Sequence, residues 1–247
     1  MLELPASWGD PEAALARVAL ELERGGPTDL VLLPEASLTG YVSREGDFDI
    51  TRFAEPADGQ TSQALAALAK RHHVNLVAPI ILCDGARCFN TMAAFDRDGG
   101  PLFSYRKRHP WIPETWATAG AEPSPMIDIE GALVTIAICY DVQFAEEFAA
   151  AFDAADLLLF PSAWVEEKDS RPFILADLAR RHHIAVANAN WGPGIVRIAG
   201  QGDSMILDAH GETLARVPRP PVAFSPLLER VIRADAVLAL KSGGRLS

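Results

Sequence analysis

The chain has 247 residues, which is enough for one large domain or two small ones with a sizeable buried core. Hydrophobic residues make up 49% of the chain and charged residues 22%, as in ordinary globular proteins. A formal net charge of −11 repels phosphate backbones and anionic lipid surfaces, which argues against nucleic acid and membranes as partners. The three cysteines do not suggest a disulfide framework, and neither a signal peptide nor a membrane-length apolar run is evident, so we expect a cytoplasmic protein.

Short apolar runs alternate with helix-like stretches along the chain. Turn signals at 98–100 and 209–211 predict two hairpins. The alternation indicates an α/β fold in which helices cover sheets. In chain order, the periodicity predicts a strand over 29–33, a helix over 61–73, strands over 74–81, 90–96, 102–105 and 133–138, a helix over 144–152, a strand over 157–160, a helix over 172–181, and strands over 184–188, 205–208 and 213–217.

The chain also repeats itself. Residues 29–34, Asp-Leu-Val-Leu-Leu-Pro, resemble residues 156–161, Asp-Leu-Leu-Leu-Phe-Pro, and in each half a later helix ends in Arg-His-His before another strand. Ala/Leu-rich helices resemble one another by chance, but the shared Arg-His-His and strand-Pro favour a true pseudo-repeat. Two such halves would bury their bare sheet faces against each other, which predicts a four-layer αββα sandwich. We expect a single domain over 1–240 and a C-terminal tail over 241–247.

Two polar side chains stand at predicted strand ends, where α/β folds expose reactive groups. Cys139 follows a strong apolar strand and precedes Tyr140-Asp141, and backbone N–H groups there can face a developing oxyanion. A buried Cys is inert in most proteins, however, and position alone favours that interpretation. Glu35 follows the first strand, whereas the matching position of the second half holds Ser162. This asymmetry points to a function for Glu35, with capping or ion pairing as alternatives.

A third group of polar residues follows the strand that ends at Tyr105. Lys107 lies in a basic run whose common interpretation is a solvated turn. Glu114 comes seven residues later, in a loop whose Trp111 and Trp116 are apolar enough to line a pocket.

The histidines are candidates for a base or a metal ligand. Four of them lie in the two Arg-His-His helix ends, where a partial positive charge suits the helix dipole, so structural roles are expected there. His210 lies in a turn. His109 is the histidine placed to rival Glu35 as the base for Cys139, and the residues by themselves leave that choice open.

Together these residues resemble the nitrilase superfamily of carbon–nitrogen hydrolases. The matching segments, in the family's order, are Leu33-Pro34-Glu35, Tyr105-Arg106-Lys107 and Ile138-Cys139-Tyr140-Asp141. The stretch 107–116 is especially similar to aliphatic-amide amidases, and 161–164, 187–190 and 202–204 also fit. The resemblance covers nearly the whole chain. It implies the αββα fold and assembly into a homodimer or a larger homo-oligomer.

The resemblance also implies a catalytic set of Glu35, Lys107 and Cys139, with Glu114 as a second glutamate. Cys139 would be the nucleophile and Glu35 its base, while Lys107 and the Tyr140 backbone N–H would stabilise the oxyanion. No metal or organic cofactor is needed for this chemistry. The candidate substrate-binding residues are Tyr140, Trp111, Trp116, Trp164 and Asn190.

Three classes of function compete. The leading one is hydrolysis of a small carboxamide to a carboxylate and ammonia; a nitrile, an N-carbamoyl amine or the omega-amide of a dicarboxylate would suit the same fold. The second is a non-catalytic interaction protein, against which the intact Glu35, Lys107 and Cys139 argue. The third is a nucleotide-binding α/β protein, but the glycines at 192–194 and 200–202 are too irregular for a phosphate loop and no Lys follows them.

Overall fold

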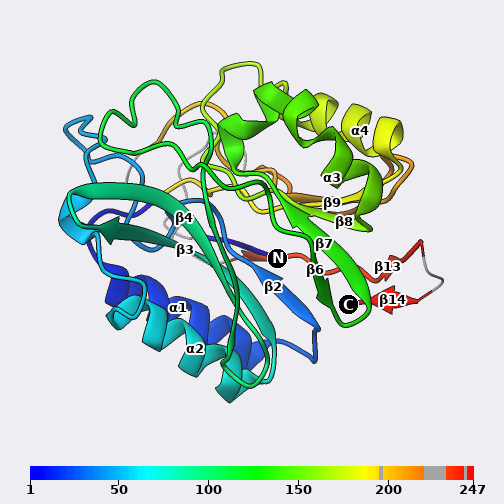
Figure 1. The fold of residues 1–247 in the computed structure, drawn as a ribbon, viewed down its shortest axis with the longest axis horizontal. Coiled ribbons are helices and arrows are strands. Elements are labelled where there is room, and N and C mark those ends of the chain that lie inside the picture. The colour runs from blue at the N-terminus through cyan, green and yellow to red at the C-terminus, as the bar shows by residue number, and fades with distance from the viewer. Residues whose placement is uncertain (195–196, 220–231, 242–243) are drawn as a thin grey trace.

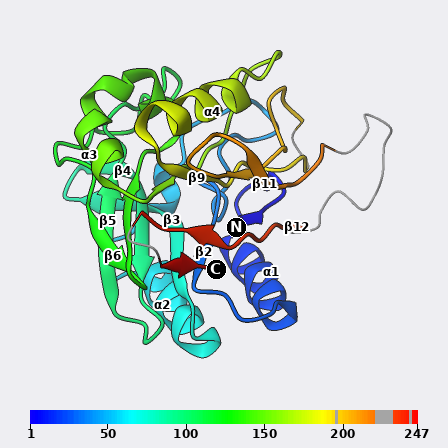
Figure 2. The same ribbon diagram turned by 90° about the vertical axis from the view of Figure 1, so that its right-hand side faces the viewer.

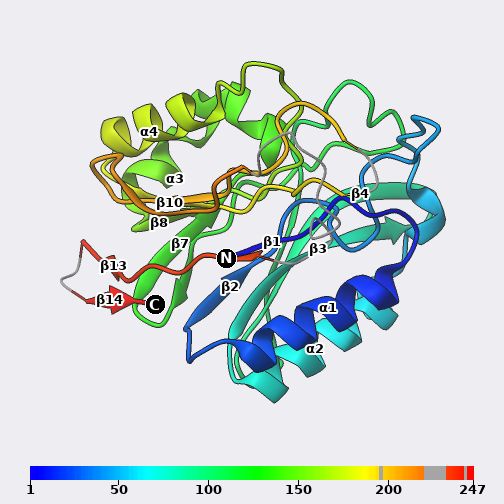
Figure 3. The ribbon, with the colours of Figure 1, turned by 180° about the vertical axis from the view of Figure 1, so that it is seen from behind.

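Two β-sheets lie face to face in the computed structural model, and helices cover the outer face of each (Figure 1). The structure describes residues 1–194, 197–219, 232–241 and 244–247. Seen from behind, α1 and α2 lie below one sheet, and α3 and α4 lie above the other (Figure 3). The predicted four-layer αββα sandwich is therefore confirmed.

The first sheet has the strand order β2-β3-β4-β5, and the second has the order β11-β10-β9-β8-β7-β6. The elements of the first half are β1 (Leu2–Glu3), α1 (Pro11–Arg24), β2 (Leu30–Leu32), η1 (Thr51–Phe53), α2 (Gln60–His72), β3 (Asn75–Asp84), β4 (Arg87–Phe95) and β5 (Pro101–Arg106). Those of the remainder are β6 (Ile127–Ile129), β7 (Ala132–Ile136), η2 (Cys139–Phe148), α3 (Ala149–Ala154), β8 (Leu157–Leu159), α4 (Arg171–His182), β9 (Ala185–Asn188), β10 (Met205–Leu207), β11 (Thr213–Arg216), β12 (Ile232–Arg233), β13 (Leu238–Ala239) and β14 (Arg245–Leu246).

The predicted pseudo-repeat is present in the pairing of the strands. β2 pairs with β3 in parallel, and β8 pairs with β9 in parallel. Each pair continues into two further antiparallel strands, which gives β3-β4-β5 in one half and β9-β10-β11 in the other. Both connecting helices end with the second His of Arg-His-His in the left-handed region, at φ 53° for His73 and φ 49° for His183. The repeated tripeptide is thus a repeated helix end that turns the chain into the next strand.

Helix α1 is an element that the sequence patterns above did not identify. Its N-terminus carries Pro11 in the first turn, and the Asp10 carboxylate accepts a hydrogen bond from the Ala13 N–H at 2.9 Å. Ala14, Val18 and Leu22, spaced four residues apart, form its buried face. The helix therefore covers the first sheet beside α2 (Figure 1).

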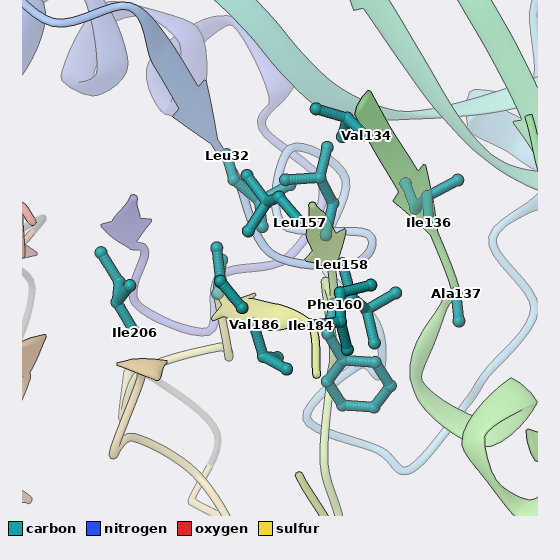
Figure 4. Packing of buried hydrophobic residues seen from close by; sticks show 14 of the residues in the cluster. Leu32, Val134, Ile136, Ala137, Leu157, Leu158, Phe160, Ile184, Val186 and Ile206 are labelled. Carbon is teal, nitrogen blue, oxygen red and sulfur yellow. The ribbon is translucent and has the colours of Figure 1, made fainter. Parts of the chain in front are cut away.

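Two apolar layers hold the sandwich together, and strand β2 contributes to both. Val31 packs in the cluster that includes α1 and α2, whereas Leu32 packs with residues of the second sheet. Figure 4 shows Leu32 pointing toward second-sheet side chains such as Leu157. Alternate residues of one strand thus join the helix layer and the partner sheet, as the period of two requires.

The segment after β7 differs in detail from the expected helix over 144–152. It is a 3₁₀ helix, Cys139–Phe148, followed by the short α-helix Ala149–Ala154. The backbone leaves helical values at Phe144, with φ −114° and ψ 32°. This kink interrupts the periodic hydrogen bonding, so the apolar pattern marks the region but not its helix type.

The C-terminal residues differ from the expected tail over 241–247. Arg245–Leu246 pairs with β13, and Leu246 is buried. The Ser247 N–H and hydroxyl donate to the Asp29 carboxylate at 2.9 and 2.8 Å. Figure 2 shows the C-terminal strands lying between the two halves of the molecule. Backbone pairing and one buried leucine fix residues 245–247 despite their low apolar content. In the described part of the chain, no helix is long and apolar enough to cross a membrane.

Candidate active site

Three predicted residues meet at one edge of the sandwich. Glu35 follows β2, Lys107 follows β5 and Cys139 follows β7. Strand β2 is parallel to β3, and both β3 and β5 are antiparallel to β4. Strands β2 and β5 therefore run in the same direction, and their carboxyl ends lie at the same edge of the sheet. The Lys107 ammonium lies 2.6 Å from Glu35 Oε1. The Cys139 thiol lies close enough to the same carboxylate for each group to shift the pKa of the other. The topology thus joins an acid–base group, a cation and a thiol from distant parts of the chain.

Glu114 belongs to the same cluster. Its Oε2 lies 2.6 Å from the Lys107 ammonium and accepts the Trp111 N–H at 2.5 Å. Glu35, Lys107 and Glu114 are each at most 2% exposed. Burying two carboxylates around one ammonium is costly, so the arrangement calls for an explanation beyond stability.

Asn90 lies near the N-terminal end of β4, at the same edge of the sheet, and links the carboxylates of Glu35 and Glu114. Its Nδ2 donates to Glu35 at 2.8 Å and to Glu114 at 2.6 Å. The other oxygen of Glu35 accepts the Ala163 N–H at 2.9 Å, from the loop after β8. Glu35 is therefore held by both halves of the molecule, and its rotamer is fixed relative to Cys139.

Cys139 sits on a constrained turn. Its φ of 45° is in the left-handed region, and its N–H donates to the Pro161 carbonyl at 3.0 Å. The buried Asp141 carboxylate braces the turn, since it accepts the Ile138 N–H at 3.0 Å and the Tyr105 hydroxyl at 2.8 Å. The strand end and the Lys107 loop are thus tied together below the thiol.

The electrostatics of the cluster follow from burial and from its three charges. Burial raises the pKa of Glu35; the Lys107 charge opposes this shift and the Glu114 charge adds to it. Burial alone would lower the pKa of Lys107, but the two carboxylates outweigh it and raise that pKa, so Lys107 stays charged. Burial and the Glu35 charge raise the pKa of Cys139 well above its usual range. The resting thiol is therefore protonated and needs a base to react.

A cavity of about 220 Å³ opens over Cys139. Of the predicted substrate-binding residues, Tyr140, Trp111 and Trp164 line it. Its complete described lining consists of Trp111, Cys139, Tyr140, Gln143, Ala163, Trp164, Val165, Glu166 and Ser170.

Two predicted substrate-binding residues lie elsewhere. Asn190 is buried, and its amide bonds to Ser162, the Trp164 N–H and two glycine carbonyls. Its polar atoms are used in holding loops together, which corrects the prediction that Asn190 lines the pocket. Trp116 packs in an apolar cluster with Trp111 instead of lining the cavity. Sequence position does not reveal side-chain direction, which caused both errors.

His109 does not take the position of a rival base. Its ring stacks on Phe144 at a centroid separation of 3.7 Å, and Nε2 lies 3.3 Å from Glu147. Among the described residues, the Glu35 charge acts on Cys139, whereas His109 neither influences its pKa nor lines the cavity over it.

Sequence reasoning missed Asn90 and the bracing role of Asp141. A signal for Asn90 exists, because Asn90 and Thr91 are the two polar residues of the mainly apolar run from Phe89 to Phe95. Asp141 lies in a motif quoted above, but nothing in the sequence marks its partners. Among residues 1–194, 197–219, 232–241 and 244–247, no group of three or more His, Cys, Asp or Glu side chains could hold a metal ion.

Comparison with known proteins places the chain in a family. The chain is 27% identical over 244 residues to the 2-oxoglutaramate amidase of Bacillus subtilis, covering 95% of this chain and 88% of that protein. It is 26% identical over 226 residues to an (R)-stereoselective amidase of a Pseudomonas species, covering 90% and 81%.

Solved structures agree with these relatives. An amidase from a Nesterenkonia species superposes with a TM-score of 0.75 at 26% identity, covering 89% of this chain and 85% of that one. A CN-hydrolase superfamily protein from Xanthomonas campestris has the same fold, with a TM-score of 0.81 at 23% identity over 96% and 89% of the two chains. The family model described as carbon–nitrogen hydrolase matches residues 5–221. The chain therefore belongs to the carbon–nitrogen hydrolase family of the nitrilase superfamily.

Proposed function

We propose that the protein hydrolyses a small carboxamide to a carboxylate and ammonia through a thioester on Cys139. The observation that carries this proposal is the buried cluster beside Cys139: the Glu35 carboxylate is paired with Lys107 at 2.6 Å and accepts the N–H of Ala163, which lines the same cavity as Cys139. The resemblance to curated amidases supports an amide as the substrate.

In the first step, Glu35 takes the thiol proton while the Cys139 sulfur attacks the amide carbon. The Lys107 ammonium and the Tyr140 backbone N–H stabilise the oxyanion that forms. Loss of one such donor in other enzymes costs about 3–4 kcal/mol of transition-state stabilisation. Glu114 holds Lys107 in place and keeps it charged.

In the second step, Glu35 gives the proton to the amide nitrogen, the C–N bond breaks and ammonia leaves. In the third, Glu35 takes a proton from water, and the resulting hydroxide attacks the thioester carbon. The C–S bond then breaks, the sulfur regains its proton and the carboxylic acid departs. A carboxyl that accepts and returns a proton at each stage works best with a raised pKa, as burial gives Glu35.

A related structure supports the covalent step. A mutant of the Nesterenkonia amidase, 25% identical to this chain, has the acetamide moiety of fluoroacetamide covalently added at its active-site cysteine. We propose that Cys139 forms the corresponding bond here. A nitrile, an N-carbamoyl amine or an omega-amide remains the alternative substrate, and a homo-oligomer in the cytoplasm remains the expected setting.

The test is ammonia release from a panel of primary amides, nitriles and N-carbamoyl amines. We expect release from amides by the wild-type protein and none by Cys139→Ala, with unchanged circular dichroism. Mass spectrometry of a rapidly quenched reaction should find the acyl group on Cys139. Hydrolysis that survives Cys139→Ala would overturn the mechanism. Loss of activity in His109→Ala with retention in Glu35→Gln would favour a Cys–His enzyme instead.

A further inference from the structure

The cavity over Cys139 has an unbalanced charge. Its described lining includes the carboxylate of Glu166 and no Lys, Arg or His. Lys107 does not offset Glu166, because its ammonium is already paired with Glu35 and Glu114 at 2.6 Å each. The charge that a bound acyl group meets in the cavity is therefore negative.

Glu166 is held so that one oxygen is engaged and the other is available. Its Oε2 accepts the Ser170 N–H at 2.7 Å, the Ser170 hydroxyl at 2.6 Å and the Trp164 Nε1–H at 3.1 Å. Its Oε1 accepts no hydrogen bond from the described residues. This atom is also absent from the buried polar atoms of the described residues that lack a partner, so it is open to a ligand. The Ser170 hydrogen bonds lower the pKa of Glu166, so the side chain is ionised at neutral pH.

Aromatic rings add to this preference. Trp111 and Trp164 line the same cavity, and the face of an indole ring attracts cations. The Trp164 ring is oriented by its own hydrogen bond to Glu166. A carboxylate with adjoining indole rings is a favourable environment for an ammonium group and an unfavourable one for a carboxylate.

We infer that Glu166 is a specificity-determining residue that selects amides with a positively charged acyl group and rejects amides that carry a carboxylate. The inference rests on the proposed hydrolysis at Cys139. It predicts that the omega-amides of dicarboxylates are the poorest of the candidate substrates named above, because they carry a carboxylate. A purely structural role for Glu166, capping Ser170 at the beginning of α4, would not produce this selection.

The test uses three primary amides of matched length: δ-aminovaleramide, hexanamide and adipic acid monoamide. We expect kcat/KM for the cationic amide to exceed that for hexanamide by about tenfold, and the anionic amide to fall below hexanamide by a similar factor. In Glu166→Gln, which keeps an oxygen for the Ser170 hydrogen bonds, both ratios should move toward one. Equal ratios in the wild type and in Glu166→Gln would overturn the inference.

Glu167→Gln is the matched control. Glu167 is an exposed neighbour that does not line the cavity, so removing its charge should leave both ratios unchanged. Because each ratio compares two substrates on one protein, partial unfolding of a variant cancels. A shift in Glu167→Gln as large as that in Glu166→Gln would assign the effect to general surface charge and overturn the inference.

A second measurement does not depend on turnover. Rates of Cys139 alkylation by neutral iodoacetamide and anionic iodoacetate are followed by peptide mass spectrometry, which separates Cys139 from Cys83 and Cys88. We expect the iodoacetamide-to-iodoacetate ratio to drop about tenfold in Glu166→Gln but not in Glu167→Gln. If every amide is inert while this drop is observed, the proposed reaction fails and the charge selection stands; an unchanged ratio overturns the charge selection.

Discussion

The two halves of the molecule share a framework but differ in what they bury at its edge. Equivalent backbone hydrogen bonds align them: Lys107 N–H donates to the Asn90 carbonyl at 2.8 Å, and Val217 N–H donates to the Ser204 carbonyl at 2.8 Å. The first half therefore has Lys107 and Asn90 where the second half has Val217 and Ser204.

The strand ends differ in the same way. Leu33 N–H donates to Val77 at 2.9 Å and Phe160 N–H donates to Ala187 at 2.8 Å, which aligns Glu35 with Ser162. The framework tolerates a neutral set at these positions, as the second half demonstrates. The framework thus does not require charged residues at these three positions, and their presence in the first half is best explained by the chemistry proposed for Glu35.

The second half contributes differently. It supplies the Cys139 thiol after β7 and the Ala163 N–H that binds Glu35 after β8. Acid–base and charge groups from one half thus meet a nucleophile from the other. Face-to-face packing of the sheets is what brings the two sets into contact (Figure 1).

Among changes that compare equivalent positions of the two halves, removing the cation of the first half should have the largest effect on activity. Lys107→Met leaves Glu35 and Glu114 without their partner and removes an oxyanion donor, so we expect kcat to fall about a thousandfold. The control is Val217→Met at the equivalent position, which should retain activity close to that of the wild type. Steady-state ammonia release measures both. Comparable losses in the two variants would mean that the positions differ only in packing.

The second comparison replaces a hydrogen-bond donor of the first half with the residue found at the equivalent position of the second half. Asn90→Ser removes the amide that bonds to Glu35 and Glu114 and installs the residue found at the equivalent position. We expect kcat to fall tenfold or more and the free energy of unfolding to drop by about 1–3 kcal/mol, because two buried carboxylates lose a donor.

Its control is Ser204→Ala, which removes a hydroxyl that donates to Glu3 at 2.6 Å in the second half. We expect a similar loss of stability in urea unfolding with kcat retained. A loss of kcat in Ser204→Ala equal to that in Asn90→Ser would contradict an asymmetric role for the halves.

The third prediction concerns pH. Glu35 must be ionised to act as a base, and burial raises its pKa above the ordinary 4.5. Activity should therefore fall with decreasing pH at a midpoint above 4.5. Since the Glu114 charge also raises this pKa, Glu114→Gln should move the midpoint to lower pH.

The profile of kcat/KM against pH measures that midpoint, and Glu166→Gln serves as a control whose acid midpoint should stay close to that of the wild type. An acid midpoint that Glu114→Gln moves upward would show that another group limits the rate.

The smallest effects should come from two equivalent hairpin glycines. Gly99 has φ 86° and Gly211 has φ 76°. A Cβ at either would approach a helix carbonyl, Ala66 at 2.8 Å or Ala176 at 2.6 Å. We expect Gly99→Ala and Gly211→Ala each to lower stability by about 1–2 kcal/mol with kcat unchanged. Thermal unfolding measures this loss of stability. Clearly different losses in the two variants would contradict the structural equivalence of the two hairpins.

Much of the fold follows from sequence alone. The matched strand-Pro and Arg-His-His segments predicted two halves and their sandwich, because an apolar sheet face must be buried and the halves have only each other. Glu35 and Cys139 were also found in sequence, as polar residues where apolar strands end, whereas the family resemblance supplied Lys107 and Glu114. Helix α1 was detectable from the spacing of Ala14, Val18 and Leu22, although it was not identified.

Other features depended on tertiary structure. Three such features join residues that are 10 or more positions apart in the chain. They are the hydrogen bonds from Asn90 to two carboxylates, the packing of His109 on Phe144 and the hydrogen bonds of the buried Asn190 side chain. Side-chain direction at such places is set by which loops pack together, which local pattern does not encode. Sequence thus determined the framework and the reactive residues at its edge. Only the tertiary structure decided which of those residues touch, because strand pairing gathers Glu35, Asn90 and Lys107 within the first half, and the packing of the two sheets brings the second half's Ala163 N–H to Glu35.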